Sequence, residues 1–116
     1  MRSEQLLVVE DDFILRFDLV MTLEDEGYPV LSTCNADAAI ALLNEQDIRA
    51  VISDVRMPGS MDGIGLAHTV QARWPHVPVL LMSGHVRPEE VPPSVHLFVK
   101  PISPRQLTTT IHRVLS

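Results

Sequence analysis

Short apolar runs alternate with helical patterns along the whole chain. The run Leu6-Leu7-Val8-Val9 has no polar position, which is typical of a strand buried on both faces of a parallel sheet. The predicted strands are residues 6–9, 30–33, 50–53, 77–82 and 97–99. Between them, apolar residues recur at helical spacing in residues 13–26, 36–46 and 64–73, and again after Pro104. This alternation predicts an α/β fold with a mostly parallel sheet and helices on both faces.

Capping residues and helix breakers mark the ends of the predicted helices. Asp12 and Asn35 are suitable N-caps for the first two helices, and Gly27 is a natural stop for the first. Ser103, followed by Pro104 at the first helical position, begins the last helix. The first and last helices also carry apolar stripes, which include Phe17 and Ile111. Core packing explains these stripes as well as a homodimer interface does.

One connection departs from the pattern. Residues 85–95 contain Pro88, Pro92 and Pro93. Proline removes a backbone donor and clashes with the preceding helical turn, so this segment can form at most a stunted helix. We therefore expect the fourth helix of the fold to be shortened or irregular.

Composition narrows the class of protein. The 116 residues are 46% hydrophobic and 21% charged, which is ordinary for a globular chain and predicts one domain over residues 1–116. A net charge of −6 without a basic cluster argues against direct nucleic-acid binding. No apolar stretch approaches the roughly 20 residues that span a bilayer. Cys34 is the only cysteine, so we expect no internal disulfide and a reducing, cytoplasmic location.

Acidic residues follow two of the predicted strands. Glu10 and Asp11 come directly after residues 6–9, and Asp54 comes directly after residues 50–53. Ligands of open α/β sheets bind at the carboxyl ends of the strands, so these side chains are expected at one edge if the strands are neighbours. Carboxylates held close together repel one another unless a hard divalent cation lies between them. The sequence therefore predicts a Mg²⁺ site.

Asp54, Ser83 and Lys100 are candidates for phosphate chemistry at the same edge. A carboxylate beside a cation can attack phosphorus to form an aspartyl phosphate, although a lone Asp54 would more often be a cap. Lys100 could pair with Asp54 or with a phosphoryl oxygen, or be an ordinary solvated charge. Ser83 could donate to a phosphoryl oxygen or simply form a turn.

Short motifs with these residues at their centres resemble a known family. They are Val8-Val9-Glu10-Asp11, Asp54-Val55-Arg56-Met57-Pro58-Gly59, Met61-Asp62-Gly63, Ser83-Gly84 and Lys100-Pro101. In this order and spacing, the chain resembles over its whole length the receiver domain of bacterial two-component response regulators, in the CheY-like superfamily. The resemblance implies a flavodoxin-like, doubly wound, five-stranded parallel sheet with strand order 2-1-3-4-5.

The resemblance also implies a role for each site residue. Asp54 would be the phosphoacceptor, taking a phosphoryl group from a sensor histidine kinase or a histidine phosphotransfer protein. Mg²⁺ would be held by Glu10, Asp11, Asp54 and the backbone carbonyl of Arg56. Ser83 would be the hydroxyl that responds to phosphorylation, and Lys100 the lysine that pairs with the phosphorylated site. A protein–protein interaction with a downstream target would then change.

Two positions correspond to those that modulate phosphoryl hydrolysis in the family, and a third differs from the residue that the family usually has. Arg56 and His85 lie two residues after Asp54 and Ser83, where the family tunes hydrolysis of the phosphoryl group. The family's usual aromatic switch position is occupied by Leu97. Phe98 is adjacent but should point to the opposite side of its strand. The chain therefore departs from the family at the customary aromatic switch.

Two other functions compete with the phosphoacceptor. The first is a receiver-like binding module that works without phosphorylation, which Leu97 and the proline-rich segment favour. The second is a metal-dependent phosphatase with an aspartyl nucleophile, which requires a second acid where this chain has Arg56. The phosphoacceptor is expected to catalyse only its own phosphorylation and dephosphorylation, and so not to be an enzyme with an external substrate.

Overall fold

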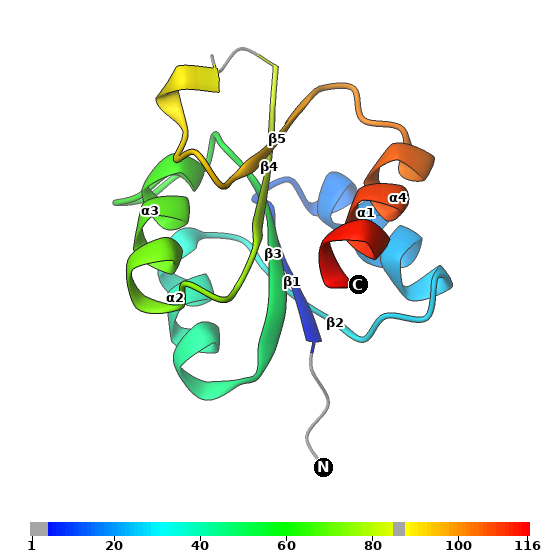
Figure 1. Cartoon of the computed structure of the whole chain (residues 1–116), viewed down its shortest axis with the longest axis horizontal. Helices are drawn as coiled ribbons and strands as arrows, with labels where there is room; N and C mark the ends of the chain where they lie inside the picture. The colour runs from blue at the N-terminus through cyan, green and yellow to red at the C-terminus, as the bar shows by residue number, and fades with distance from the viewer. Residues whose placement is uncertain (1–4, 85–87) are drawn as a thin grey trace.

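A computed structural model describes residues 5–84 and 88–116 as a parallel sheet flanked by helices (Figure 1). The strands are β1 (Gln5–Val9), β2 (Val30–Thr33), β3 (Ile48–Asp54), β4 (Val79–Ser83) and β5 (His96–Val99). They are all paired in parallel in the order β2-β1-β3-β4-β5. The helices are α1 (Phe13–Asp25), α2 (Ala36–Glu45), α3 (Gly63–Arg73) and α4 (Pro104–Leu115). The predicted fold class and strand order are confirmed.

The sheet separates two apolar layers. Helices α2 and α3 cover one face, and α1 and α4 cover the other (Figure 1). Leu7, Val51 and Leu81 point toward α2 and α3, whereas their neighbours Leu6 and Ile52 point toward α1 and α4. All five are essentially buried, because alternate side chains of a strand point to opposite faces and both faces are covered. The central strands therefore hold their carboxyl ends in a rigid setting.

The predicted N-caps are present and satisfied. Asp12 Oδ1 accepts hydrogen bonds from the backbone N–H groups of Ile14 and Leu15 at 2.9 and 3.1 Å. The side chains of Asn35 and Ser103 cap α2 and α4 in the same way. An N-cap of this kind contributes about 1 kcal/mol to stability. Gly27 follows α1 with φ +94°, a conformation that glycine adopts without strain.

Some element borders differ from the prediction. β3 extends from Ile48 through Asp54, so the predicted acceptor is the last residue of the strand and does not follow it. α3 begins at Gly63 because Asp62 caps it, its carboxylate accepting from the N–H of Gly65 at 2.9 Å. β4 begins at Val79, after Pro78, which has no N–H to donate to the sheet.

The proline-rich connection is irregular, as predicted. Its described part contains one turn of 3₁₀ helix, η1 (Pro88–Glu90), which lies on the same side of the sheet as α3 (Figure 1). Val91 and Val95 then pack against the layer of α2 and α3. His85, the predicted modulator, lies outside the described residues.

Helix α1 exposes several large apolar side chains. Phe13 and Ile14 are each 69% exposed, Phe17 is 57% exposed and Met21 is 42% exposed; we call these four residues the α1 outer face. Leu23 is the one residue of α1 that is fully buried. The sequence leaves core packing and a homodimer interface open for the apolar stripe of α1. Ile14, Phe17 and Met21 lie outside the core, whereas Val20 packs against it.

None of the helices within residues 5–84 and 88–116 is long and apolar enough to cross a bilayer.

Candidate functional site

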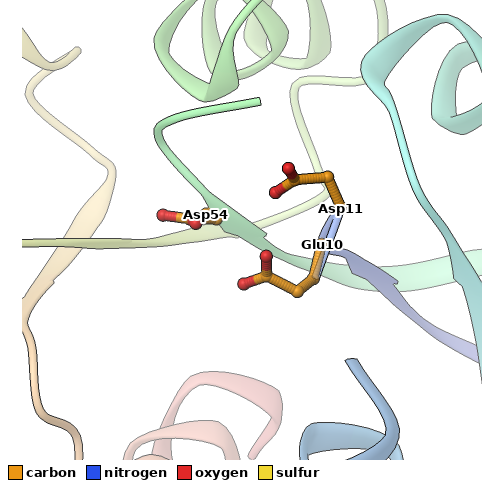
Figure 2. A group of neighbouring side chains, drawn as sticks. All are labelled: Glu10, Asp11 and Asp54. Carbon is orange, nitrogen blue, oxygen red and sulfur yellow. The ribbon is translucent and has the colours of Figure 1, made fainter. Parts of the chain in front are cut away.

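Three carboxylates meet at the carboxyl edge of the sheet. Glu10 and Asp11 directly follow β1, and Asp54 ends the neighbouring strand β3. One carboxylate oxygen from each residue lies within 4.8 Å of those of the other two, and Figure 2 shows the three side chains around one space. The strand pairing predicted from the sequence thus brings the acids together.

Burial makes this cluster electrostatically costly. Glu10 is 1% exposed and Asp54 is 8% exposed, whereas Asp11 is open to solvent. The pKa of Glu10 is raised from 4.5 to about 7, mainly by burial and also by the nearby charge of Asp54, while the backbone N–H of Asp12 and the charge of Lys100 oppose the rise. A cation in the space between the carboxylates would offset this repulsion.

The donor set fits a hard divalent cation. The side-chain ligand atoms available in the cluster are all carboxylate oxygens, which Mg²⁺ prefers over nitrogen or sulfur. Arg56, whose backbone carbonyl was the further predicted ligand, follows β3 by two residues and has an exposed side chain.

Lys100 approaches the same carboxylate from β5. Its Nζ lies 3.1 Å from Oδ2 of Asp54. Its backbone N–H donates to the carbonyl of Ser83 at 2.9 Å, so the ends of β4 and β5 are tied together beneath the ammonium group. The ammonium therefore reaches the acceptor carboxylate from a fixed backbone position.

Ser83 and Leu97 are positioned by the register of the last strands. Ser83 ends β4 and is buried, one residue beyond Met82, the partner of Asp54. Leu97 is half-buried on the side of α2 and α3, while Phe98 is buried on the side of α1 and α4. Phe98 thus points away from Leu97, as period-two alternation predicts.

Two contacts that hold Glu10 were missed by sequence reasoning. The Asp12 backbone N–H donates to Glu10 Oε2 at 3.1 Å, and Arg16 Nη1 donates to the Glu10 backbone carbonyl at 2.8 Å. Arg16 lies one helical turn after the N-cap Asp12, and its N–H donates to the Asp12 carbonyl. An arginine at that spacing after a run of acids is the signal that could have found it.

The loop after Asp54 packs closely on the strand. The N–H of Gly63 donates to the carbonyl of Val55 at 2.8 Å. A Cβ atom at Gly63 would lie 2.3 Å from the backbone oxygen of Asp54, closer than any side chain can approach. Glycine is therefore needed at the start of α3.

Comparison with known proteins identifies relatives for almost all of the chain. The family model "Response regulator receiver domain" matches residues 6–112. The chain is 42% identical over 83 residues to the response regulator protein FleR of Pseudomonas aeruginosa, covering 72% of this chain and 17% of FleR. It is 34% identical over 86 residues to a putative response regulator NtrX-like of Rickettsia felis, covering 73% of this chain and 18% of that protein.

Solved structures agree with this result. The chemotaxis response regulator CheY4 of Vibrio cholerae superposes with a TM-score of 0.86 at 28% identity, covering 97% of this chain and 99% of CheY4. The chain thus matches CheY4 over nearly its full length, but spans less than a fifth of FleR and of the NtrX-like protein.

Proposed function

Because the chain belongs to the response regulator receiver family of two-component signalling, we propose that Asp54 accepts a phosphoryl group from a histidine kinase or a histidine phosphotransfer protein. The observation that carries this proposal is the meeting of Asp54 with Glu10, Asp11 and Lys100 at one edge of the sheet. A buried carboxylate flanked by acids and an ammonium suits transfer of a charged group better than it suits a structural cap.

The proposed reaction is a displacement at phosphorus. An oxygen of the Asp54 carboxylate attacks, the P–N bond of the phosphohistidine breaks, and an acyl phosphate forms. The imidazole leaves with the electron pair of the broken bond. Lys100 Nζ, already 3.1 Å from Asp54 Oδ2, faces the negative charge of the arriving phosphoryl oxygens.

Mg²⁺ is the cofactor that we propose for this site. Glu10, Asp11 and Asp54 would hold it, together with the backbone carbonyl of Arg56. When bound, the ion supplies the positive charge that offsets the carboxylates and the phosphoryl oxygens. The hydrogen bond from the Asp12 N–H and the contact of Arg16 with the Glu10 backbone orient Glu10 for this role.

We propose that the rate at which the acyl phosphate on Asp54 is hydrolysed depends on Arg56 and His85. The exposed Arg56 side chain, and His85 after Ser83, would shield the acyl phosphate from water and set its lifetime. An unchanged dephosphorylation rate after replacing both with alanine would contradict this. We propose that the protein catalyses only its own phosphorylation and dephosphorylation, with no external substrate, in the cytoplasm, where the exposed thiol of Cys34 stays reduced.

The α1 outer face supports a protein as the phosphoryl donor. Its apolar residues begin at Phe13, directly after Glu10, Asp11 and Asp12, so they border the edge where phosphohistidine must arrive. Contiguous exposed apolar residues commonly mark protein–protein contacts. We propose that the donor packs on this face while its histidine reaches Asp54.

Output is proposed to involve Ser83, Leu97 and a downstream protein target. Ser83 would turn its hydroxyl to the phosphoryl group, and the half-buried Leu97 would follow, without an aromatic ring. The absence of that ring and the single turn of η1 favour a second candidate function, a receiver-like module that binds its partner without phosphorylation.

Phosphorylation with a small donor tests the first candidate. Incubation with acetyl phosphate, with and without Mg²⁺, should add one phosphoryl group by intact mass. The adduct should require Mg²⁺ and should be absent in Asp54→Ala. Asp25→Asn, an exposed acid on α1 away from the site, serves as the matched control and should be phosphorylated normally.

The outcome separates the two candidate functions. An adduct on Asp54 supports the phosphoacceptor. Failure with acetyl phosphate calls for a phosphorylated histidine protein as the donor, and failure with both contradicts the phosphoacceptor and favours the phosphate-independent module.

A further inference from the structure

A groove lies beside the site, between α1 and the segment that joins β5 to α4. Its volume is about 480 Å³, and Glu10 and Lys100 line the part that adjoins the acid cluster. Small-molecule sites usually measure roughly 300–1,000 Å³, so the groove is large enough for a ligand.

The wall formed by α1 is mixed in polarity. Leu15, Asp18, Leu19 and Thr22 line the groove and recur at spacings of three, one and three, which is one face of a helix. A carboxylate and a hydroxyl among leucines oppose closure of the groove by apolar packing, because burying them without partners costs free energy. Asp18 is exposed, so its charge remains hydrated at the mouth.

The opposite wall carries no charged side chain. It runs from Pro101 to Pro104 and includes the half-buried Ile102. The hydroxyl of Ser103 accepts the N–H of Gln106 at 3.0 Å and keeps its own O–H as a donor. The charge of an ionic ligand would therefore be met from the side of α1.

Charge decides what that polar group should be. The ionisable residues of the lining are Glu10, Asp18 and Lys100. Lys100 is paired with Asp54, and Glu10 belongs to the carboxylate cluster. Within residues 5–84 and 88–116, no hydrogen bond or ion pair is recorded for Asp18, so its negative charge is the one left to complement.

We propose that this groove binds a small amphipathic monocation, an amine or an amidine. Its apolar body lies between Leu15, Leu19 and Ile102, and its cationic group pairs with Asp18. Buried Met82 and Leu107 provide further apolar contact.

A charge series of matched probes tests the proposal. Phenylbutylamine, phenylbutanol and phenylbutyrate share an apolar body and differ in charge. They are titrated into the isotope-labelled protein while backbone amide NMR signals are followed. The amine is expected to bind with a dissociation constant of about 1 mM or below, with shifts centred on Leu15, Thr22 and Leu107. The alcohol should bind more weakly, and the carboxylate most weakly.

Asp18→Asn isolates the charge. It should lower the affinity for the amine about fivefold and leave that for the alcohol unchanged, since an exposed ion pair is worth up to roughly 1 kcal/mol. Asp25→Asn, on the same helix, should change neither. Equal binding of all three probes, tighter binding of the carboxylate, shifts away from the groove, or no saturable binding of the amine would each overturn the proposal.

A ligand bound in the groove should also affect the reactivity of Asp54, because Lys100 lines the groove and pairs with that carboxylate. Coupling to Asp54 rests on the proposed function, whereas binding in the groove does not. The amine should change the rate of phosphorylation by acetyl phosphate in the wild type, and Asp18→Asn should need about five times more amine for the same change. A protein that is never phosphorylated contradicts the proposed function, while the NMR titration still decides whether the groove binds the cation.

Discussion

Helices α1 and α4 cover the same face of the sheet but relate to solvent in opposite ways. α4 buries Leu107, Thr110 and Ile111 and turns polar side chains such as Arg105 and Arg113 outward. α1 buries Leu23 and turns its outer face of Phe13, Ile14, Phe17 and Met21 to water. The apolar residues of α4 are therefore explained by folding, and those of the α1 outer face require another explanation.

The two helices also leave the site at different points. α1 begins directly after the acids Glu10 and Asp11, and α4 begins shortly after Lys100. The phosphoryl donor that we propose would meet the beginning of α1 on its way to Asp54. The difference between the helices thus separates residues that hold the fold from residues that we propose receive the donor.

The largest expected effect is on folding through α4. Ile111→Ala should lower the free energy of unfolding by about 2–5 kcal/mol, because it leaves a cavity in a fully buried position. Phe17→Ala on α1 should cost less than about 0.5 kcal/mol, as at most exposed sites. Urea unfolding followed by circular dichroism measures both; equal losses would mean that the α1 outer face is part of the core.

The next effect is a pH dependence of the free energy of unfolding, caused by Glu10, which lies just before α1. Folding raises the pKa of Glu10 from 4.5 to about 7, so the folded state favours protonated Glu10. Its contribution to stability is complete below pH 4.5 and is lost as the pH rises through 7, by roughly 3 kcal/mol for such a shift. Urea unfolding in a metal chelator should show this loss between pH 5 and pH 8, by about that amount.

Two variants and the metal check that assignment. Glu10→Gln should remove most of the loss, whereas Glu24→Gln, an exposed glutamate of α1, should leave it intact. Adding Mg²⁺ at the higher pH should restore stability to the wild type but not to Glu10→Gln. An unchanged pH profile in Glu10→Gln would rule out this carboxyl as its source.

A third effect concerns the donor. Replacing Phe13 and Phe17 together by serine should slow phosphoryl transfer from a phosphorylated histidine protein about 30-fold, the cost of losing a few apolar anchors. Phosphorylation by acetyl phosphate should be unchanged, since that donor needs no docking surface. The control Arg105→Ser on α4 should affect neither reaction. Equal slowing with both donors would instead indicate damage to the site.

The smallest effect compares the two N-caps. Asp12→Ala and Ser103→Ala should each lower the free energy of unfolding by about 1 kcal/mol. Asp12→Ala should also weaken Mg²⁺ binding modestly, because the Asp12 N–H contacts Glu10 Oε2 and the cap fixes its position. Metal titration by calorimetry compares the two variants. Equal metal affinity would show that the cap does not orient Glu10.

Much of the fold and of the acid cluster can be predicted from short stretches of the sequence. The run 6–9 and the caps Asp12, Asn35 and Ser103 depend on neighbouring residues only, and they were predicted correctly. Parallel pairing then brings Glu10 and Asp54 together without further information.

The rest depends on contacts between distant segments. α1 has apolar residues on every side, so its buried side is decided by where β2 and α4 lie, which no periodicity reveals. The groove cannot be predicted from the sequence either, because its lining combines α1 with a segment far later in the chain, including Asp18 and Ile102. Arg16 contacts the Glu10 backbone from the first turn of α1, so its spacing after the acids could have revealed this contact.

Gly63 gives the molecule a direct mechanical link. Its backbone lies so close to that of Asp54 that no side chain fits between them, and its N–H donates to the carbonyl of Val55. Flexible side chains ordinarily absorb small displacements between packed elements, but no side chain lies between the backbones of Asp54 and Gly63. A shift of the Asp54 carbonyl would therefore be passed directly to the backbone at the first turn of α3.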